Sequence, residues 1–143
     1  MKHVNIYVES IPKSIGKNDG YYIYLLEYVT DKGPATYHRI VEYKDKTPEQ
    51  AQLQAVTEAI THIHKPCEVT LFVTVTQLVT HIRYFLKEWA KRDYRNQNGD
   101  KLKDYESWKN FWLESSVYQL WVNNGTHEYS KWLLKQLEQC AGH

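Results

Sequence analysis

The sequence has few cysteines and no long apolar run. Its two cysteines, Cys67 and Cys140, stand in no metal-ligand spacing, and two thiols do not make a disulfide framework. We expect both to be free thiols in a reducing compartment. No apolar stretch approaches the length of a membrane-spanning helix, and no signal peptide opens the chain. We therefore expect a cytoplasmic protein without a membrane partner.

Several motifs that would point to a reaction are also missing. The sequence has no recognisable Ser/His/Asp or Cys/His signature and no Gly-rich phosphate-binding loop. Its seven histidines are scattered, and His62 and His64, two residues apart, cannot share one face of a helix. The formal net charge is +1, so the chain as a whole is not a simple polycation.

The composition that remains is that of a soluble globular protein. The 143 residues suffice for a single domain, 1–143, with a core that needs no staples. Aromatic residues are unusually frequent, with 12 Tyr, 5 Trp and 3 Phe, and we expect most of them to fill the core and line grooves. A minority are candidates for stacking against a ligand.

Residue patterns predict a mixed α/β fold. The alternation of apolar and polar residues in 4–9 indicates a strand, and 21–30 and 35–43 complete a β-meander. A helix is predicted over 47–63, with Thr47 as the N-cap, Pro48 at its first position and Gln50 closing a capping box. On this helix Gln52 points toward the apolar stripe rather than toward water.

The second half of the chain alternates helices with strands. The expected elements are a buried strand at 68–75, a helix at 77–92, a polar break at 93–103, a helix at 104–114, a strand at 117–122, a turn at 123–126 and a helix at 127–139. The predicted order is βββαβααβα, a mixed five-stranded sheet flanked by helices.

This order, and four segments within it, resemble the ribonuclease H family and bacterial ribonuclease HI in particular. The segments are 4–10, 47–60, 67–79 and 126–137. In that family each segment carries one metal-binding carboxylate, and the resemblance places the four positions at Glu9, Gln52, Thr74 and Lys131. One acid is kept, two positions are neutral and one is a cation. The resemblance therefore implies the ribonuclease H-like fold with a degenerate active site.

Family enzymes cut the RNA strand of a hybrid with two Mg²⁺ ions, which need carboxylate oxygens to neutralise them. Glu9 alone cannot position two ions, and a protonated Lys131 repels them. We therefore expect no catalytic residue, no metal and no cofactor, with Mg²⁺ or Mn²⁺ needed only if residual nuclease activity exists.

In place of the metals we expect an ion pair between Glu9 and Lys131, because a lone buried carboxylate is costly unless it is paired. Gln52 and Thr74 would complete a hydrogen-bonded polar plug around it. The alternative is that Lys131 extends to solvent. A shift of one residue in the last helix would bring Ser130 to the same place.

A second resemblance lies in residues 86–112, which are similar to the basic protrusion, or handle, with which bacterial ribonuclease HI grips hybrid duplexes. Residues 83–109 hold 8 basic and 5 acidic side chains, a local net charge of +3, as a nucleic-acid surface requires. The alternative is a solvated helix face of mixed charge. The candidate nucleic-acid contacts are Lys87, Trp89, Lys91, Arg92, Tyr94, Arg95, Lys101 and Lys103.

The family often carries a histidine in the turn before its last helix, as a product-release or proton-transfer group. His127 stands close to that place, although the glycine-histidine motif itself is replaced by Asn123-Asn124-Gly125. Taken alone, His127 is expected to be a surface or capping residue.

Three functions remain open from the sequence. The first is a catalytically inactive domain that binds an RNA/DNA hybrid or duplex nucleic acid through the handle, with phosphate contacts and little sequence selectivity. The second is a structural domain that holds a protein partner and no nucleic acid. The third is a weak or altered metal-dependent ribonuclease H that uses Glu9 with recruited acids.

Overall fold

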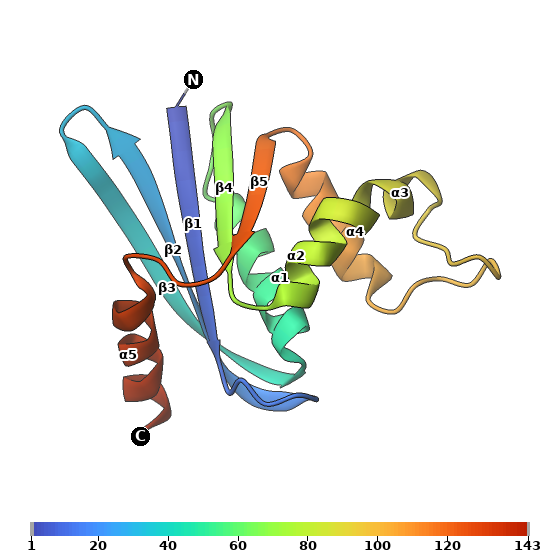
Figure 1. The fold of residues 1–143 in the computed structure, drawn as a ribbon, viewed down its shortest axis with the longest axis horizontal. Coiled ribbons are helices and arrows are strands. Elements are labelled where there is room, and N and C mark those ends of the chain that lie inside the picture. Colours follow the sequence, from blue (N-terminus) through green and yellow to red (C-terminus); the bar gives the residue numbers. More distant parts are fainter. Residues whose placement is uncertain (1, 143) are drawn as a thin grey trace.

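A five-stranded mixed sheet forms the centre of the protein, and helices cover both of its faces (Figure 1). The computed structural model describes residues 2–142. The strands are β1 (Lys2–Ile11), β2 (Asn18–Thr30), β3 (Gly33–Lys46), β4 (Cys67–Val73) and β5 (Gln119–Asn124). They lie in the order β3-β2-β1-β4-β5, with the meander antiparallel and β1, β4 and β5 parallel to one another. The predicted mixed sheet and element order are confirmed.

The helical segments are α1 (Pro48–Ile60), α2 (Thr76–Thr80), the π-helix η1 (His81–Phe85), α3 (Leu86–Lys91), α4 (Tyr105–Ser115) and α5 (Ser130–Ala141). The helices α2, η1 and α3 follow one another without a gap, so the helix predicted over 77–92 is one helical run with a π turn at its centre.

The start of α1 is fixed by the predicted capping box. The hydroxyl of Thr47 accepts from the backbone N–H of Gln50, and the Gln50 side chain accepts from the backbone N–H of Thr47. The helix presents small buried residues, Ala51, Ala55 and Ala59, to the sheet. Small side chains let α1 lie close to the strands, which brings Gln52 to the carboxyl ends of β1 and β4.

Successive residues of β1 and β2 serve two separate cores because strand side chains alternate between faces. On one face the sheet packs against α1 and α4, and the core there includes Tyr22 and Tyr24 of β2 and Phe111 of α4, all fully buried. The other face packs against α5 through Tyr7, Ile23, Leu25, Leu133 and Leu137. Each fully buried large apolar side chain stabilises the fold by about 1.5–3 kcal/mol.

Two boundaries near the C-terminus differ from the prediction. The last strand begins at Gln119, not 117, and ends at Asn124, inside the turn predicted over 123–126. Its start is delayed because Tyr118 still belongs to the turn that ends α4, where its N–H donates to Ser115 O at 3.0 Å. The last helix begins at Ser130, not 127, because the N–H of His127 donates to the Ser130 hydroxyl at 2.9 Å and holds the preceding residues in a turn.

A close approach shapes the link between β1 and β2. A Cβ atom on Gly20 would lie 2.0 Å from the carbonyl oxygen of Ile11, so only glycine fits there. The hydroxyl of Tyr43 donates to the same carbonyl at 3.0 Å. This junction holds the base of the loop that carries Lys13. Among residues 2–142, no helix is long and apolar enough to cross a membrane.

Candidate functional site

Three of the four family positions meet at the carboxyl ends of two neighbouring parallel strands. Glu9 lies near the end of β1, and Thr74 directly follows β4. Gln52 reaches them from the second turn of α1. Glu9 is 2% exposed and Gln52 is 1% exposed, so two of the three residues are buried, whereas Thr74 is partly exposed.

The orientation of the Gln52 amide follows from one backbone contact. The N–H of Thr74 donates to Oε1 of Gln52 at 3.0 Å, and a backbone N–H can act only as a donor. The amide nitrogen of Gln52 therefore points the other way, where it donates to the hydroxyls of Thr74 at 2.7 Å and Ser10 at 3.0 Å. All the hydrogen-bonding groups of this side chain face protein partners.

Glu9 completes the network as its one carboxylate. Its Oε1 accepts from the Thr74 hydroxyl at 3.3 Å and lies 3.7 Å from Nζ of Lys13. Burial raises the pKa of Glu9, and the ammonium of Lys13 and the Thr74 hydrogen bond offset this only in part. The polar plug expected from the sequence is confirmed in Glu9, Gln52 and Thr74, and Ser10 is an additional member.

The expected ion pair between Glu9 and Lys131 is wrong. Within residues 2–142 the ammonium group that lies within 4 Å of Glu9 belongs to Lys13. Helix α5 starts at Ser130, whose side chain is buried, and Lys131, one position on, is exposed. Successive residues of a helix point in directions about 100° apart. Because Ser130 points inward, the next residue, Lys131, points outward. The sequence did not predict Lys13 as the partner of Glu9, because it lies in the irregular loop between β1 and β2, whose path follows no residue pattern.

The donor set does not fit a pair of divalent cations. It contains a single carboxylate, and the oxygen of Gln52 is engaged by Thr74. In the described part of the chain, residues 2–142, no group of three or more His, Cys, Asp or Glu side chains is placed to hold a metal ion. Mg²⁺ requires several hard oxygen ligands with compensating negative charge, which these residues do not provide.

A groove of about 530 Å³ adjoins the plug and extends to Lys103 in the handle. Thr74, Lys13 and Lys103 are among the residues that line it. Its remaining walls include the acidic residues Glu49 and Asp104. The groove joins the family active-site position to the base of residues 86–112.

An aromatic cluster anchors the handle helix to the start of α1. Trp89 packs edge-on against Trp108 with ring centroids 5.2 Å apart, and His81 lies 5.2 Å from Trp89. Nδ1 of His81 is 2.5 Å from Oε2 of Glu49, the second residue of α1. The cluster fixes the direction in which the handle leaves the body of the protein, at the β5 side of the sheet (Figure 1).

The two aromatic residues predicted to contact nucleic acid differ in their exposure to solvent. Trp89 keeps a partly exposed ring at the edge of the cluster. Tyr94 is only 5% exposed, so its predicted contact with a nucleic-acid backbone is wrong. Its backbone has a left-handed φ of 58°, and its N–H donates to Trp89 O at 2.7 Å, which turns the ring back into the core.

The basic residues of the handle fall into two sets. Lys101 and Arg95 pair with Asp93, at 2.9 Å and 3.7 Å, and Lys91 pairs with Glu88 at 3.4 Å. The other predicted contacts are exposed and take part in no ion pair within residues 2–142; they are Lys87, Arg92 and Lys103. The freely solvated positive charge is thus smaller than the sequence count indicates.

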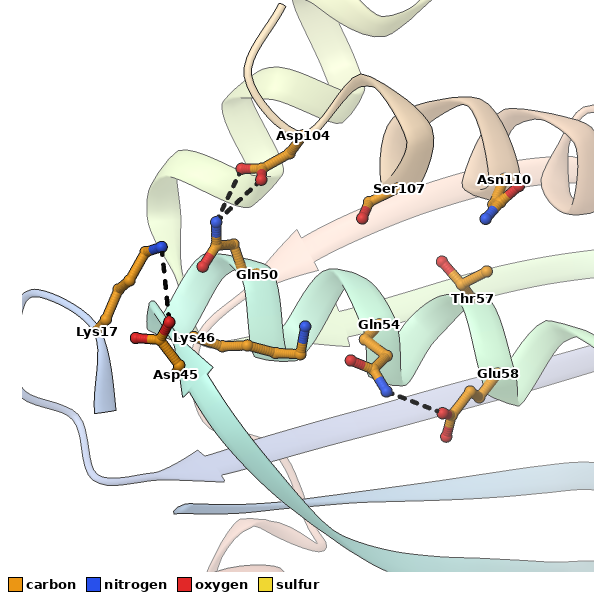
Figure 2. Close-up of a pocket in the computed structure, with 10 residues that line it drawn as sticks. All are labelled: Lys17, Asp45, Lys46, Gln50, Gln54, Thr57, Glu58, Asp104, Ser107 and Asn110. Atoms are coloured by element: carbon orange, nitrogen blue, oxygen red, sulfur yellow. Dashed lines mark hydrogen bonds and ion pairs between the residues drawn. The ribbon is translucent and has the colours of Figure 1, made fainter. Parts of the chain in front are cut away.

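A second hollow, of about 440 Å³, lies along the seam between α1 and α4 (Figure 2). Its walls are polar, and its charges oppose one another, as Lys17 and Asp45 do at 4.0 Å. The Gln50 amide donates to both carboxylate oxygens of Asp104 at 3.0 Å. Asp104 has a left-handed φ of 63° and directly precedes α4. Its contact with Gln50 therefore ties the end of the handle to α1.

A buried carboxylate on the α5 face was missed from the sequence. Glu27 is 6% exposed and accepts hydrogen bonds from Tyr129 at 2.6 Å, Asn5 at 2.9 Å and Tyr7 at 3.3 Å. Burial alone would raise the pKa of Glu27, but these hydrogen bonds outweigh it and hold the pKa below its ordinary value. The alternation of Ile23, Leu25 and Glu27 on one strand face was the available signal.

His127 lies in the turn before α5, as the resemblance implies. Its Nδ1 accepts from the backbone N–H of Tyr129 at 3.1 Å, a bond within the turn, and no side chain within residues 2–142 caps the start of α5, so the predicted capping role is wrong. The ring is not on the surface, because it packs against Tyr7 with centroids 4.4 Å apart and also against Phe72. Burial lowers the pKa of His127, because it disfavours the charged imidazolium.

No family model matches the sequence. The chain is 29% identical over 112 residues to ribonuclease HI of Helicobacter pylori, a match that covers 67% of this chain and 75% of that protein. It is 27% identical over 124 residues to ribonuclease HI of Campylobacter jejuni, which covers 80% of each chain.

Solved structures share the fold over almost the whole chain. The crystal structure of LC9-RNase H1, described as a type 1 RNase H with the type 2 active-site motif, has a TM-score of 0.76 at 17% identity and covers 99% of this chain and 73% of that one. The foamy viral protease-reverse transcriptase in complex with an RNA/DNA hybrid has a TM-score of 0.65 at 15% identity and covers 99% of this chain and 20% of that one. The chain therefore has the ribonuclease H fold, and its sequence is similar to that of bacterial ribonuclease HI.

Proposed function

We propose that this protein binds an RNA/DNA hybrid or another nucleic-acid duplex through its handle and does not hydrolyse it. The observation that carries the proposal is the buried network in which Glu9, Gln52 and Thr74 bond to one another and to Ser10. Hydrolysis by two metal ions requires a cluster of carboxylates at this place. A site with one carboxylate and a saturated amide supplies neither the negative charge nor the open oxygen atoms.

The handle supports the binding half of the proposal. Lys87, Arg92 and Lys103 are exposed and free of ion pairs within residues 2–142, so each can contact a phosphate without losing an internal partner. The partly exposed Trp89 offers an apolar edge beside them. The foamy viral protein of the same fold is solved with an RNA/DNA hybrid, and a related structure of it is solved with double-stranded DNA.

The groove beside the plug extends the proposed surface. Lys103 stands at the base of the handle and Lys13 at the Glu9 end, on the walls of the same hollow of about 530 Å³. A sugar-phosphate backbone lying between these two lysines would pass over Thr74 and the start of α1. The contacts are to phosphates, so we expect affinity that falls steeply with salt and little sequence selectivity.

A scaffold function is the second candidate, and a specific observation favours it. Three handle residues, Lys91, Arg95 and Lys101, are already neutralised by Glu88 or Asp93. Internal neutralisation of this kind weakens a phosphate-binding surface, and it is compatible with a domain that holds a protein partner. A residual nuclease, the activity for which the sequence relatives are named, would have to depend on Glu9.

One assay separates the three functions. A hybrid with a labelled RNA strand is titrated with the protein at several salt concentrations, and the same mixtures are then incubated with Mg²⁺ or Mn²⁺. The proposal predicts salt-dependent binding and an intact RNA strand. The absence of binding at the lowest salt concentration would favour the scaffold, and cleavage that is abolished by Glu9→Gln would establish a nuclease.

A further inference from the structure

The two edges of the sheet differ in how their free backbone groups are covered. At the β5 edge, the carbonyl oxygen of Val122 accepts from Nε of Arg83 at 3.1 Å and from a second guanidinium nitrogen at 2.5 Å. At the β3 edge, no side chain or loop within residues 2–142 bonds to the backbone between Pro34 and Lys44. One edge is closed by an arginine, whereas the longer one is open.

Proline identifies which β3 residues face outward. Across the hairpin, Thr30 pairs with Gly33 and Val29 pairs with Pro34. Because proline has no N–H, the hydrogen-bonded pair must be Thr30–Gly33, and bonded pairs then recur at every second residue. The odd-numbered residues of β3 therefore bond to β2. The even-numbered residues point their backbone groups away from the sheet; they are Thr36, His38, Ile40 and Glu42.

This open edge carries none of the backbone devices that normally blunt an edge strand. Residues 35–43 contain no proline or glycine, and the one irregularity between β2 and β3 lies at Asn18 and Gly20, at the other end of the hairpin. Thr36, His38 and Glu42 are exposed, although the His38 ring packs edge-on against Trp132 with centroids 5.0 Å apart and Glu42 pairs with Lys44 at 3.0 Å. A long edge whose outward backbone groups have no partner within residues 2–142 is a template for pairing with another strand.

We propose that a second copy of this chain pairs its β3 with β3 in antiparallel fashion, about a two-fold axis at Ile40, to form a continuous ten-stranded sheet. A two-fold axis perpendicular to the sheet keeps each side chain on its own face, so even residues oppose even residues. His38 then lies opposite Glu42 of the second copy, so an imidazole faces a carboxylate in both halves of the interface, and Thr36 lies opposite Lys44, which pairs with Glu42 at 3.0 Å within each copy.

Neighbouring registers lack this complementarity. With the axis at Arg39, that guanidinium would lie directly opposite its own copy, and like charges in this position destabilise a strand pair. With the axis at Val41, His38 would lie opposite Lys44. The register at Ile40 avoids both contacts, and it places a partly buried apolar side chain at the centre.

The proposed interface is independent of the nucleic-acid function. The handle leaves the protein on the β5 side, and β3 forms the opposite edge (Figure 1). Pairing through β3 therefore leaves both handles accessible at the two ends of the assembly. Loss of nucleic-acid binding would not affect this proposal, and loss of the dimer would not affect the other one.

A single proline substitution tests the pairing, with the dimer measured by analytical sedimentation over a range of protein concentrations. His38→Pro removes an outward N–H without touching the ladder to β2, whereas the matched control His38→Ala keeps that N–H. By symmetry the proline removes two interface hydrogen bonds, so we expect the dimer to weaken by roughly tenfold or more, and the alanine control to remain dimeric. Circular dichroism and the thermal midpoint check that both variants are folded.

Cross-linking tests the register in a Cys140→Ser background. Ile40→Cys is expected to form a disulfide-linked dimer, because facing Cα atoms in a bonded pair lie about 5.5 Å apart. Thr36→Cys alone is expected not to, since its copy would be roughly 27 Å away. Thr36→Cys combined with Lys44→Cys should cross-link at exposed positions even if the Ile40 variant folds poorly. A monomer at every concentration, a dimer that persists in His38→Pro, or cross-linking of Thr36→Cys alone would overturn the proposal.

Discussion

The backbone N–H of Thr74 donates to Oε1 of Gln52 at 3.0 Å and thereby joins the end of β4 to α1. The same side chain donates to the hydroxyls of Ser10 and Thr74, so Gln52 connects the members of the polar plug. This contact is a direct bond between two elements of the fold. It gives the site a structural role that can be measured as stability.

Truncation of Gln52 tests that role. Gln52→Ala removes three hydrogen bonds and leaves a buried space, so we expect the free energy of unfolding to fall by about 3 kcal/mol. The matched control is Gln54→Ala, because Gln54 lies on the same helix but is partly exposed and bonds to Glu58 at 3.2 Å. The control should lose less than about 1 kcal/mol in urea unfolding. Equal losses in the two variants would argue against the plug.

Replacement of Glu9 should stabilise the protein. The raised pKa of Glu9 means that the native state keeps this proton to higher pH than the unfolded state, so stability falls as pH rises from about 4.5 through the raised value. Glu9→Gln removes the buried charge and should add on the order of 1 kcal/mol near neutral pH. In the exposed control Glu138→Gln, the change should stay below about 0.5 kcal/mol. Destabilisation by Glu9→Gln near neutral pH would contradict this interpretation.

Glu27 predicts the opposite dependence on pH. The pKa of Glu27 is lowered in the native state, so its contribution is complete above about pH 4.5 and is lost as pH falls through the lowered value. Tyr129→Phe removes the 2.6 Å hydrogen bond to this carboxylate and should cost about 2 kcal/mol near neutral pH. Thermal unfolding of both proteins from neutral to acid pH checks this. A constant difference across that range would show that the Glu27 charge is not involved.

The handle charges predict a change in salt dependence. Glutamine in place of Lys87, Arg92 and Lys103 should lower the slope of log affinity against log salt by about 2 to 3, since each duplex phosphate contact contributes about 0.9. Lys101→Gln is the control, because that lysine already pairs with Asp93 at 2.9 Å. Its effect on the slope should be below about 0.9. Equal effects per residue would mean that internal pairing does not divide the handle into two sets.

Much of the fold was predictable because local patterns agree with the final structure. The capping box at Thr47 and the alternation in β1 act over a few residues, and both appear as expected. The turn before α5 was not predictable in the same way. The Tyr129 hydroxyl bonds to Glu27, and the His127 ring packs against Tyr7 and Phe72, partners that are brought together only after the sheet has formed.

The same distinction explains the site. Gln52 was expected to point inward from the helix period, and it does. The partner of Glu9 was not predictable, because Lys13 reaches it through an irregular loop while the regular helix turns Lys131 away. Local periodicity fixes the direction of a side chain relative to its own element. It does not specify which long, flexible cation will reach a buried acid.

The most direct test of the central claim is calorimetric titration of the protein with Mn²⁺, compared with Glu9→Gln. Mn²⁺ takes the same hard oxygen ligands as Mg²⁺. The account predicts no saturable, stoichiometric binding that depends on Glu9, because one carboxylate bonded to Thr74 and paired with Lys13 does not hold a divalent ion. Stoichiometric binding that disappears in Glu9→Gln would contradict it.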